Sequence, residues 1–146
     1  MSLTNQKAGF PLWHWLSVSF VACAWLADPG TPGFTLRLAW FYGPLLVVVL
    51  LMRILRGSSE LALGAHAGAF LFFLVFAGWV FSAEHPEGLA WVSYLFCFPG
   101  AWVGAIVAVM LERRLLDKSR RAFATGMALI LGGIVVNALI LAAYIS

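Results

Sequence analysis

Two histidines, His14 and His66, are the side chains whose type and placement best suit cofactor chemistry. Each lies near the start of an apolar run, and both runs are expected to begin at the same face of a membrane. At about 1.5 Å per residue, both imidazoles would lie about 6–8 Å inside that face. Imidazoles at matched depth on two helices can ligate one haem iron, and a single imidazole can ligate a chlorin. The pair therefore predicts a site for haem b or a chlorin pigment.

The surroundings of His66 allow a simpler interpretation as well. Gly64 and Gly68 flank it and would let a flat macrocycle approach the helix backbone. Alternatively, each histidine forms a hydrogen bond with a neighbouring helix or with interfacial water. Polar groups near a membrane interface are easily satisfied in this way, so we prefer this second interpretation and leave the cofactor unassigned.

Other chemistry has little support in the residue types. The sequence shows no nucleophile–base pair and no phosphate-binding loop, which predicts that the chain is not an enzyme. Cys23 and Cys97 lie inside apolar runs and form no CxxC motif, which is typical of buried packing residues rather than metal ligands. The central parts of the apolar runs hold no Asp, Glu, Lys or Arg, which argues against a pump or ion-coupled transporter.

The elements that must position these residues are long apolar helices. The 146-residue chain is 63% hydrophobic and only 10% charged, whereas about 25% of the residues in a soluble domain are charged. The run 61–82 contains no charged residue, and about 20 apolar residues are enough to cross a bilayer. We therefore predict an all-α integral membrane protein, one domain over 1–146, with five transmembrane helices at about 10–27, 38–55, 61–82, 89–111 and 122–145.

Capping and helix-breaking residues add detail to two of these predicted helices. Ser58 or Ser59 precedes the third run and is a suitable N-cap, because its hydroxyl can accept from a free backbone N–H. Pro99-Gly100 lies inside the fourth run and predicts a kink or local unwinding.

The charges indicate how the helices are oriented. With five crossings, all basic residues but Arg37 fall on one side, and Arg37 lies with Asp28, Glu84 and Glu87 on the other. Because cytoplasmic loops are enriched in Lys and Arg, the N-terminus is predicted to be cytoplasmic and the C-terminus periplasmic or otherwise extracytoplasmic. This topology suits a multi-pass protein of the cell inner (plasma) membrane. The residues on the predicted cytoplasmic side are Lys7, Arg53, Arg56, Arg113, Arg114, Lys118, Arg120 and Arg121.

Small residues recur at four-residue spacing in three of the predicted helices. Two of these patterns are GxxxG motifs, and the last helix adds an Ala/Gly stripe. Gly133 and an asparagine that can hydrogen-bond across a contact lie on an adjoining stripe of that helix. In lipid, such stripes let helix backbones approach closely, either within one chain or between subunits. The predicted packing or interface residues are Gly64, Gly68, Gly100, Gly104, Ala124, Ala128, Gly132 and Asn137.

These features favour a small structural or accessory subunit of a larger membrane complex, such as a respiratory or photosynthetic one. Its predicted partners are membrane lipids, some of them bound, and other integral membrane subunits. Nucleic acid is not expected, because the positive charges lie at helix ends rather than along one stripe. One alternative is a haem- or chlorin-binding carrier using His14 and His66. A second is a small-molecule transporter, which would need a polar cavity between its helices.

Overall fold

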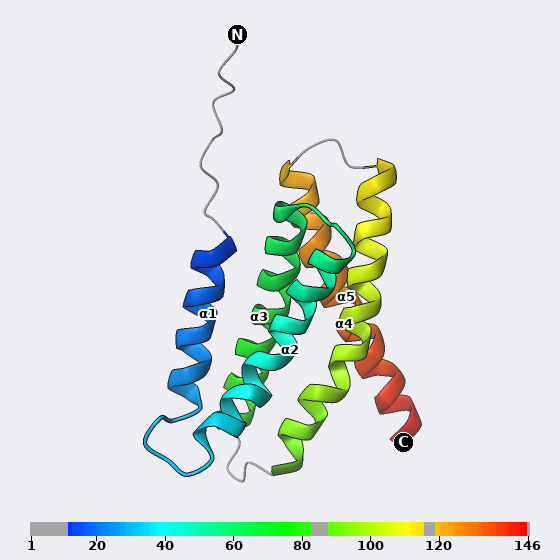
Figure 1. Cartoon of the computed structure of the whole chain (residues 1–146). Helices are drawn as coiled ribbons and strands as arrows, with labels where there is room; N and C mark the ends of the chain where they lie inside the picture. The colour runs from blue at the N-terminus through cyan, green and yellow to red at the C-terminus, as the bar shows by residue number, and fades with distance from the viewer. Residues whose placement is uncertain (1–11, 83–87, 116–118, 146) are drawn as a thin grey trace.

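The computed structural model describes residues 12–82, 88–115 and 119–145, and within them the side chains of 12–82, 91–114 and 121–144. Every regular element in these ranges is an α-helix, and they contain no strand. The prediction of an all-helical chain with five helices is thus confirmed for the described residues (Figure 1). The helices are α1 (Leu12–Leu26), α2 (Phe34–Ile54), α3 (Ser59–Ser82), α4 (Gly88–Leu115) and α5 (Ser119–Ile145).

Four helices are long and apolar enough to cross a membrane. They are α2, α3, the Trp91–Arg114 part of α4 and the Arg121–Tyr144 part of α5. The described part of α1 is apolar but has 15 residues, which extend about 22 Å against a hydrocarbon core of about 30 Å. The architecture is therefore compatible with a multi-pass membrane protein, and a crossing by α1 stays a prediction.

Two helices differ most from their predicted bounds. α2 begins at Phe34 rather than at 38, directly after its N-cap Gly33, whose φ of 82° is a left-handed conformation that favours glycine. α4 continues to Leu115 rather than ending at 111. The residues after 111 include Glu and Arg, which are polar but favour the helix. The helix is continuous through Pro99, so local unwinding there is wrong and a kink stays a prediction.

The turn between α2 and α3 follows from two capping arrangements. The Gly57 N–H donates to the Met52 carbonyl at 2.9 Å, and the Arg56 N–H donates to the Arg53 carbonyl at 3.0 Å. This is a Schellman motif in which Arg56, with φ of 59°, takes the left-handed position usually held by glycine. Ser58 is confirmed as the N-cap of α3, because its Oγ accepts from the Leu61 N–H at 3.2 Å.

α3 is the central helix of the bundle. Among the described residues it contacts all four other helices, whereas α1 contacts only α2 and α3, and α5 contacts only α3 and α4. Figure 1 shows the result: α1 lies at one side of the bundle, and α5 crosses behind α4 at the other. The α5 contacts with α3 and α4 are the most extensive in the molecule.

Aromatic side chains fill the space between α2, α3 and α4 in the half of the bundle nearest the start of α4. Tyr94 is fully buried at the centre of this aromatic cluster. Its ring lies 5.0 Å from that of Phe98 and 5.8 Å from that of Phe73, between centroids. Its hydroxyl donates to the Phe41 carbonyl at 3.2 Å. The cluster comprises Phe41, Phe72, Phe73, Phe76, Trp91, Tyr94 and Phe98.

The described charges gather at the two ends of the bundle. One end, here called the basic end, is where α2 and α4 finish and α3 and α5 start (Figure 1). It carries Arg53, Arg56, Arg113, Arg114 and Arg121. Asp28 and Arg37 lie near the opposite end, where Arg37 donates to the Pro32 carbonyl at 3.0 Å. Lys7, Glu84, Glu87 and Lys118 lie outside the described residues, as does the side chain of Arg120.

Candidate functional site

His66 lies at the junction of α1, α2 and α3 and is fully buried. Its Nε2 is 2.8 Å from the Oγ of Ser19, which comes from α1. The same Oγ lies 3.1 Å from the Leu16 carbonyl. Which of these two atoms donates depends on the tautomer of the imidazole, but either direction joins α1 to α3.

The structure does not bring His14 and His66 together. His14 lies on an exposed surface of α1, while Ser19, five residues later, faces α3 at the level of His66. Five residues correspond to about 7.5 Å along a helix and more than a quarter turn around it. In this arrangement Ser19 rather than His14 lies level with His66, and a haem shared by the two imidazoles stays a prediction. His66 instead uses its Nε2 to hold α1 against α3.

A second polar contact fixes α1 at the same place. The Tyr42 hydroxyl of α2 donates to the Leu16 carbonyl at 2.9 Å. The ring of Tyr42 packs edge-on against Phe20, with centroids 5.3 Å apart. One turn further on, Cys23 is fully buried. Because α1 contacts only α2 and α3, these few side chains determine where it docks.

We expect Ser19→Ala to loosen α1. Losing one interhelical hydrogen bond in a membrane costs about 0.6 kcal/mol, which corresponds to about threefold more frequent opening. Maleimide labelling of Cys23, followed by peptide mass spectrometry, should therefore speed up about threefold. Cys97 on α4 is a control within the same molecule, because α4 does not contact α1.

The matched control variant is Ser17→Ala. The Ser17 hydroxyl is exposed and donates at 2.9 Å to the Trp13 carbonyl of its own helix. Its removal should leave the labelling rate of Cys23 unchanged. Equal effects of the two substitutions would contradict a docking role for the Ser19–His66 bond.

The GxxxG motif of α3 packs against α5. A Cβ added at Gly64 would overlap the Phe123 carbonyl oxygen, and one at Gly68 would lie 2.9 Å from the Met127 carbonyl oxygen. From the other side, a Cβ at Gly126 would lie 2.5 Å from the Leu61 carbonyl oxygen. Real Cβ atoms do not approach so closely, so these glycines set the distance between the two backbones.

The GxxxG motif of α4 packs against the following part of α5. A Cβ at Gly100 would overlap the Gly133 carbonyl, and one at Gly133 would overlap the Gly100 carbonyl. A Cβ at Gly104 would overlap the Leu129 carbonyl. Both GxxxG motifs are thus occupied by α5 of the same chain, and α5 meets them with Gly126 and Gly133. Gly133 lies on the stripe that adjoins the predicted one, whereas Gly126 was not predicted, and its seven-residue spacing from Gly133 was the signal for it.

The predicted stripe on α5 lies on another face of the helix. Ala124, Ala128 and Gly132 are exposed, and a Cβ at Gly132 would meet nothing within 4 Å. Asn137 lies closer to α4, and its Nδ2 donates to the Phe96 carbonyl. The structure therefore separates the predicted set into intramolecular contacts and one outward stripe of α5, here called the α5 stripe.

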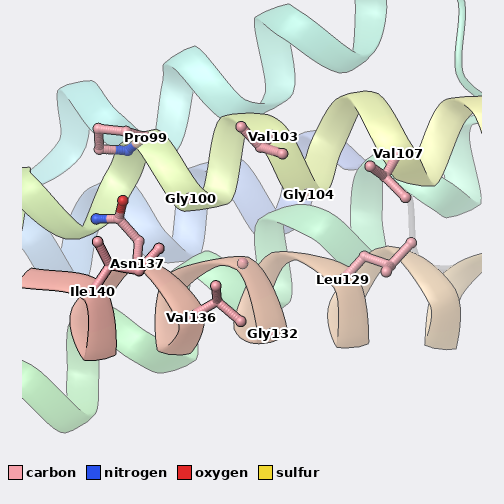
Figure 2. A pocket seen from close by; sticks show the side chains of 11 residues that line it. Pro99, Gly100, Val103, Gly104, Val107, Leu129, Gly132, Val136, Asn137 and Ile140 are labelled. Atoms are coloured by element: carbon pink, nitrogen blue, oxygen red, sulfur yellow. The ribbon is translucent and has the colours of Figure 1, made fainter.

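An apolar groove runs between α4 and α5 beside the α5 stripe. Its volume is about 400 Å³. Figure 2 shows Val103 and Val107 on the α4 side and Leu129, Val136 and Ile140 on the α5 side. Asn137 supplies the polar side chain of this lining. The groove is open rather than enclosed by the bundle, so in a membrane it would face lipid.

Metal-binding groups do not converge in the described part of the chain. No three His, Cys, Asp or Glu side chains there lie close enough to hold one ion. Cys23 and Cys97 are both free thiols on different helices. Comparisons with known protein families, curated proteins and solved structures find no match to this chain.

Proposed function

We propose that this chain is a structural subunit of a larger membrane complex, held to a neighbouring integral membrane protein through the α5 stripe. The observation that carries the proposal is the orientation of Ala124, Ala128 and Gly132. They keep the four-residue spacing that favours close helix contact, yet they are exposed while both GxxxG motifs are already occupied. A helix of a partner could approach the α5 backbone along this stripe.

The polar groups inside the helices support a structural rather than a catalytic role. Ser19, Tyr42, His66, Tyr94 and Asn137 each form a hydrogen bond that joins two helices. Such bonds in lipid stabilise a bundle by about 0.6 kcal/mol on average. These side chains are therefore used to position helices.

For the membrane arrangement we propose five crossings of the cell inner (plasma) membrane. The basic end would be cytoplasmic, with the N-terminus on that side and the C-terminus extracytoplasmic. Support comes from the five arginines at the basic end, set against Arg37 with Asp28 at the opposite end. Alternating helix directions place the start of α1 and the end of α5 at opposite ends of the bundle (Figure 1).

The test is co-purification from the chain's own membrane in mild detergent. Substituting Ala124→Leu together with Ala128→Leu adds bulk along the α5 stripe without touching a GxxxG contact. We expect recovery of the partner, quantified by mass spectrometry against the tagged chain, to fall about tenfold or more, because interface overpacking costs about 1–3 kcal/mol. A second copy carrying a different tag would reveal self-association.

The matched control is Ala39→Leu with Gly78→Leu. Both positions are small and exposed, on α2 and α3, and a Cβ at Gly78 would meet nothing within 4 Å. Partner recovery should match the wild type. Equal recovery in both double variants would contradict the proposal. A Soret band in the wild-type preparation that is lost in His66→Ala would instead favour the haem or chlorin carrier.

A further inference from the structure

The α4–α5 groove has exposed arginines beyond its end, toward the basic end of the bundle. Arg114 lies in the last turn of α4, and Arg121 lies near the start of α5. Both are exposed. An anionic phospholipid has an apolar acyl chain and a negatively charged phosphate. The apolar groove suits the acyl chain, and the two arginines suit the phosphate.

On α4, the arginine and the groove share one helix face. Pro99, Val103 and Val107 follow one another every four residues and line the groove. Arg114 comes seven residues, or two turns, after Val107 and so lies above the same stripe. It is about 10 Å from Val107 and about 22 Å from Pro99 along the axis. With one leaflet's hydrocarbon about 15 Å deep, an acyl chain whose headgroup lies at Arg114 would reach into the groove.

On α5, a similar register holds. Gly132 lines the groove and comes eleven residues, or about three turns, after Arg121. Ala128, which is small and exposed, lies between them on the same face of the helix. Long arginine side chains can extend along a helix to reach the interface, which lets both guanidinium groups approach one phosphate.

The neighbouring charges at this end are used elsewhere. Arg113 donates to the Leu55 carbonyl at 2.7 Å, and so is directed toward α2. Glu112 accepts from the Ser58 N–H at 3.0 Å, and so is directed toward the start of α3. The acidic group nearest on α4 is therefore directed toward α3, and no carboxylate lines the groove.

We propose that the α4–α5 groove binds one anionic phospholipid, with its phosphate held by Arg114 and Arg121 and an acyl chain between Val103 and Val136. The site adds to the proposed structural role and does not require the partner subunit. Its ligand is a diacyl lipid of the leaflet at the basic end. The arginines select the negative charge of the headgroup, and the groove selects the shape of the acyl chain.

The test is native mass spectrometry of the full chain released from detergent micelles. The micelles contain equal amounts of dioleoyl-phosphatidylglycerol and dioleoyl-phosphatidylcholine. We expect one retained phosphatidylglycerol on the wild type. Arg114→Gln with Arg121→Gln should lower the affinity for phosphatidylglycerol about tenfold to thirtyfold, given the contribution of each cation near a lipid surface. The charge-matched control, Arg53→Gln with Arg56→Gln, should retain it.

Two separate variants test the groove itself. Val103 and Val136 are 60% and 57% exposed, so Val103→Trp and Val136→Trp fill the groove from opposite sides without entering the buried core. Each should lower retention of phosphatidylglycerol. Retention in both would overturn the acyl-chain site, and equal losses in the two arginine double variants would overturn the headgroup site. If the wild type formed a dimer that either tryptophan variant lost, the groove would be the contact site of a second copy, and the proposed lipid site would be wrong.

Discussion

Gly100→Ala is expected to lower the free energy of unfolding by about 3 kcal/mol. The added methyl would overlap the Gly133 carbonyl, and a backbone carbonyl cannot move aside as a side-chain end can. α4 and α5 must therefore separate along their most extensive contact, and overpacking of this kind costs about 1–3 kcal/mol, occasionally more. Reversible unfolding in mixed micelles of increasing dodecyl sulfate content, followed by far-UV circular dichroism, measures the change.

Gly132→Ala is the matched control for that substitution. Gly132 precedes Gly133 in the same helix, but a Cβ there would meet nothing within 4 Å. Alanine should leave stability unchanged or raise it slightly, because alanine is the better helix former by up to about 1 kcal/mol. Similar losses in the two variants would show that the Gly100–Gly133 approach does not set the distance between α4 and α5.

Tyr94→Ala should produce the other large loss. Tyr94 is fully buried among the rings of the aromatic cluster. Lipid is as apolar as these rings, so the cost comes from the cavity rather than from transfer out of water. A residual cavity of roughly 100 Å³ at about 24 cal/mol per Å³ corresponds to about 2.5 kcal/mol. The same detergent unfolding series measures it.

Two further tyrosine variants separate ring packing from hydrogen bonding. Tyr94→Phe removes only the bond to the Phe41 carbonyl and should cost about 0.6 kcal/mol, the average for such bonds in a membrane. Tyr144 is 91% exposed, so Tyr144→Ala should cost nothing measurable. If Tyr94→Phe proved as damaging as Tyr94→Ala, the hydrogen bond rather than the packing of the ring would carry the effect.

The helices themselves could be predicted because apolar length is a local property. The run 61–82 became α3 with nearly the same bounds, and Ser58 was predictable as its cap. The end of α4 was less predictable, since Glu112 and Arg113 are polar yet favour helix. Hydropathy reports where the apolar stretch ends, whereas helix propensity and capping decide where the helix ends.

The candidate site was predictable in its residue types but not in its pairings. α5 carries small residues on more than one face, and only contact with α3 and α4 selected Gly126 and Gly133 over Ala128 and Gly132. Likewise, the depth of α1 depends on how it docks between Tyr42 and His66, which no local pattern specifies. The pairing of His66 with Ser19 rather than His14 required the three-dimensional arrangement.

The position of α5 at one side of α3 and α4 has a consequence for biogenesis. Both GxxxG faces belong to helices that leave the ribosome before α5, whose backbone covers them. α3 and α4 touch each other far less than either touches α5. During membrane insertion, the glycine faces of α3 and α4 are therefore exposed until α5 has been synthesised. In that interval they are accessible to insertases and to premature association with other helices.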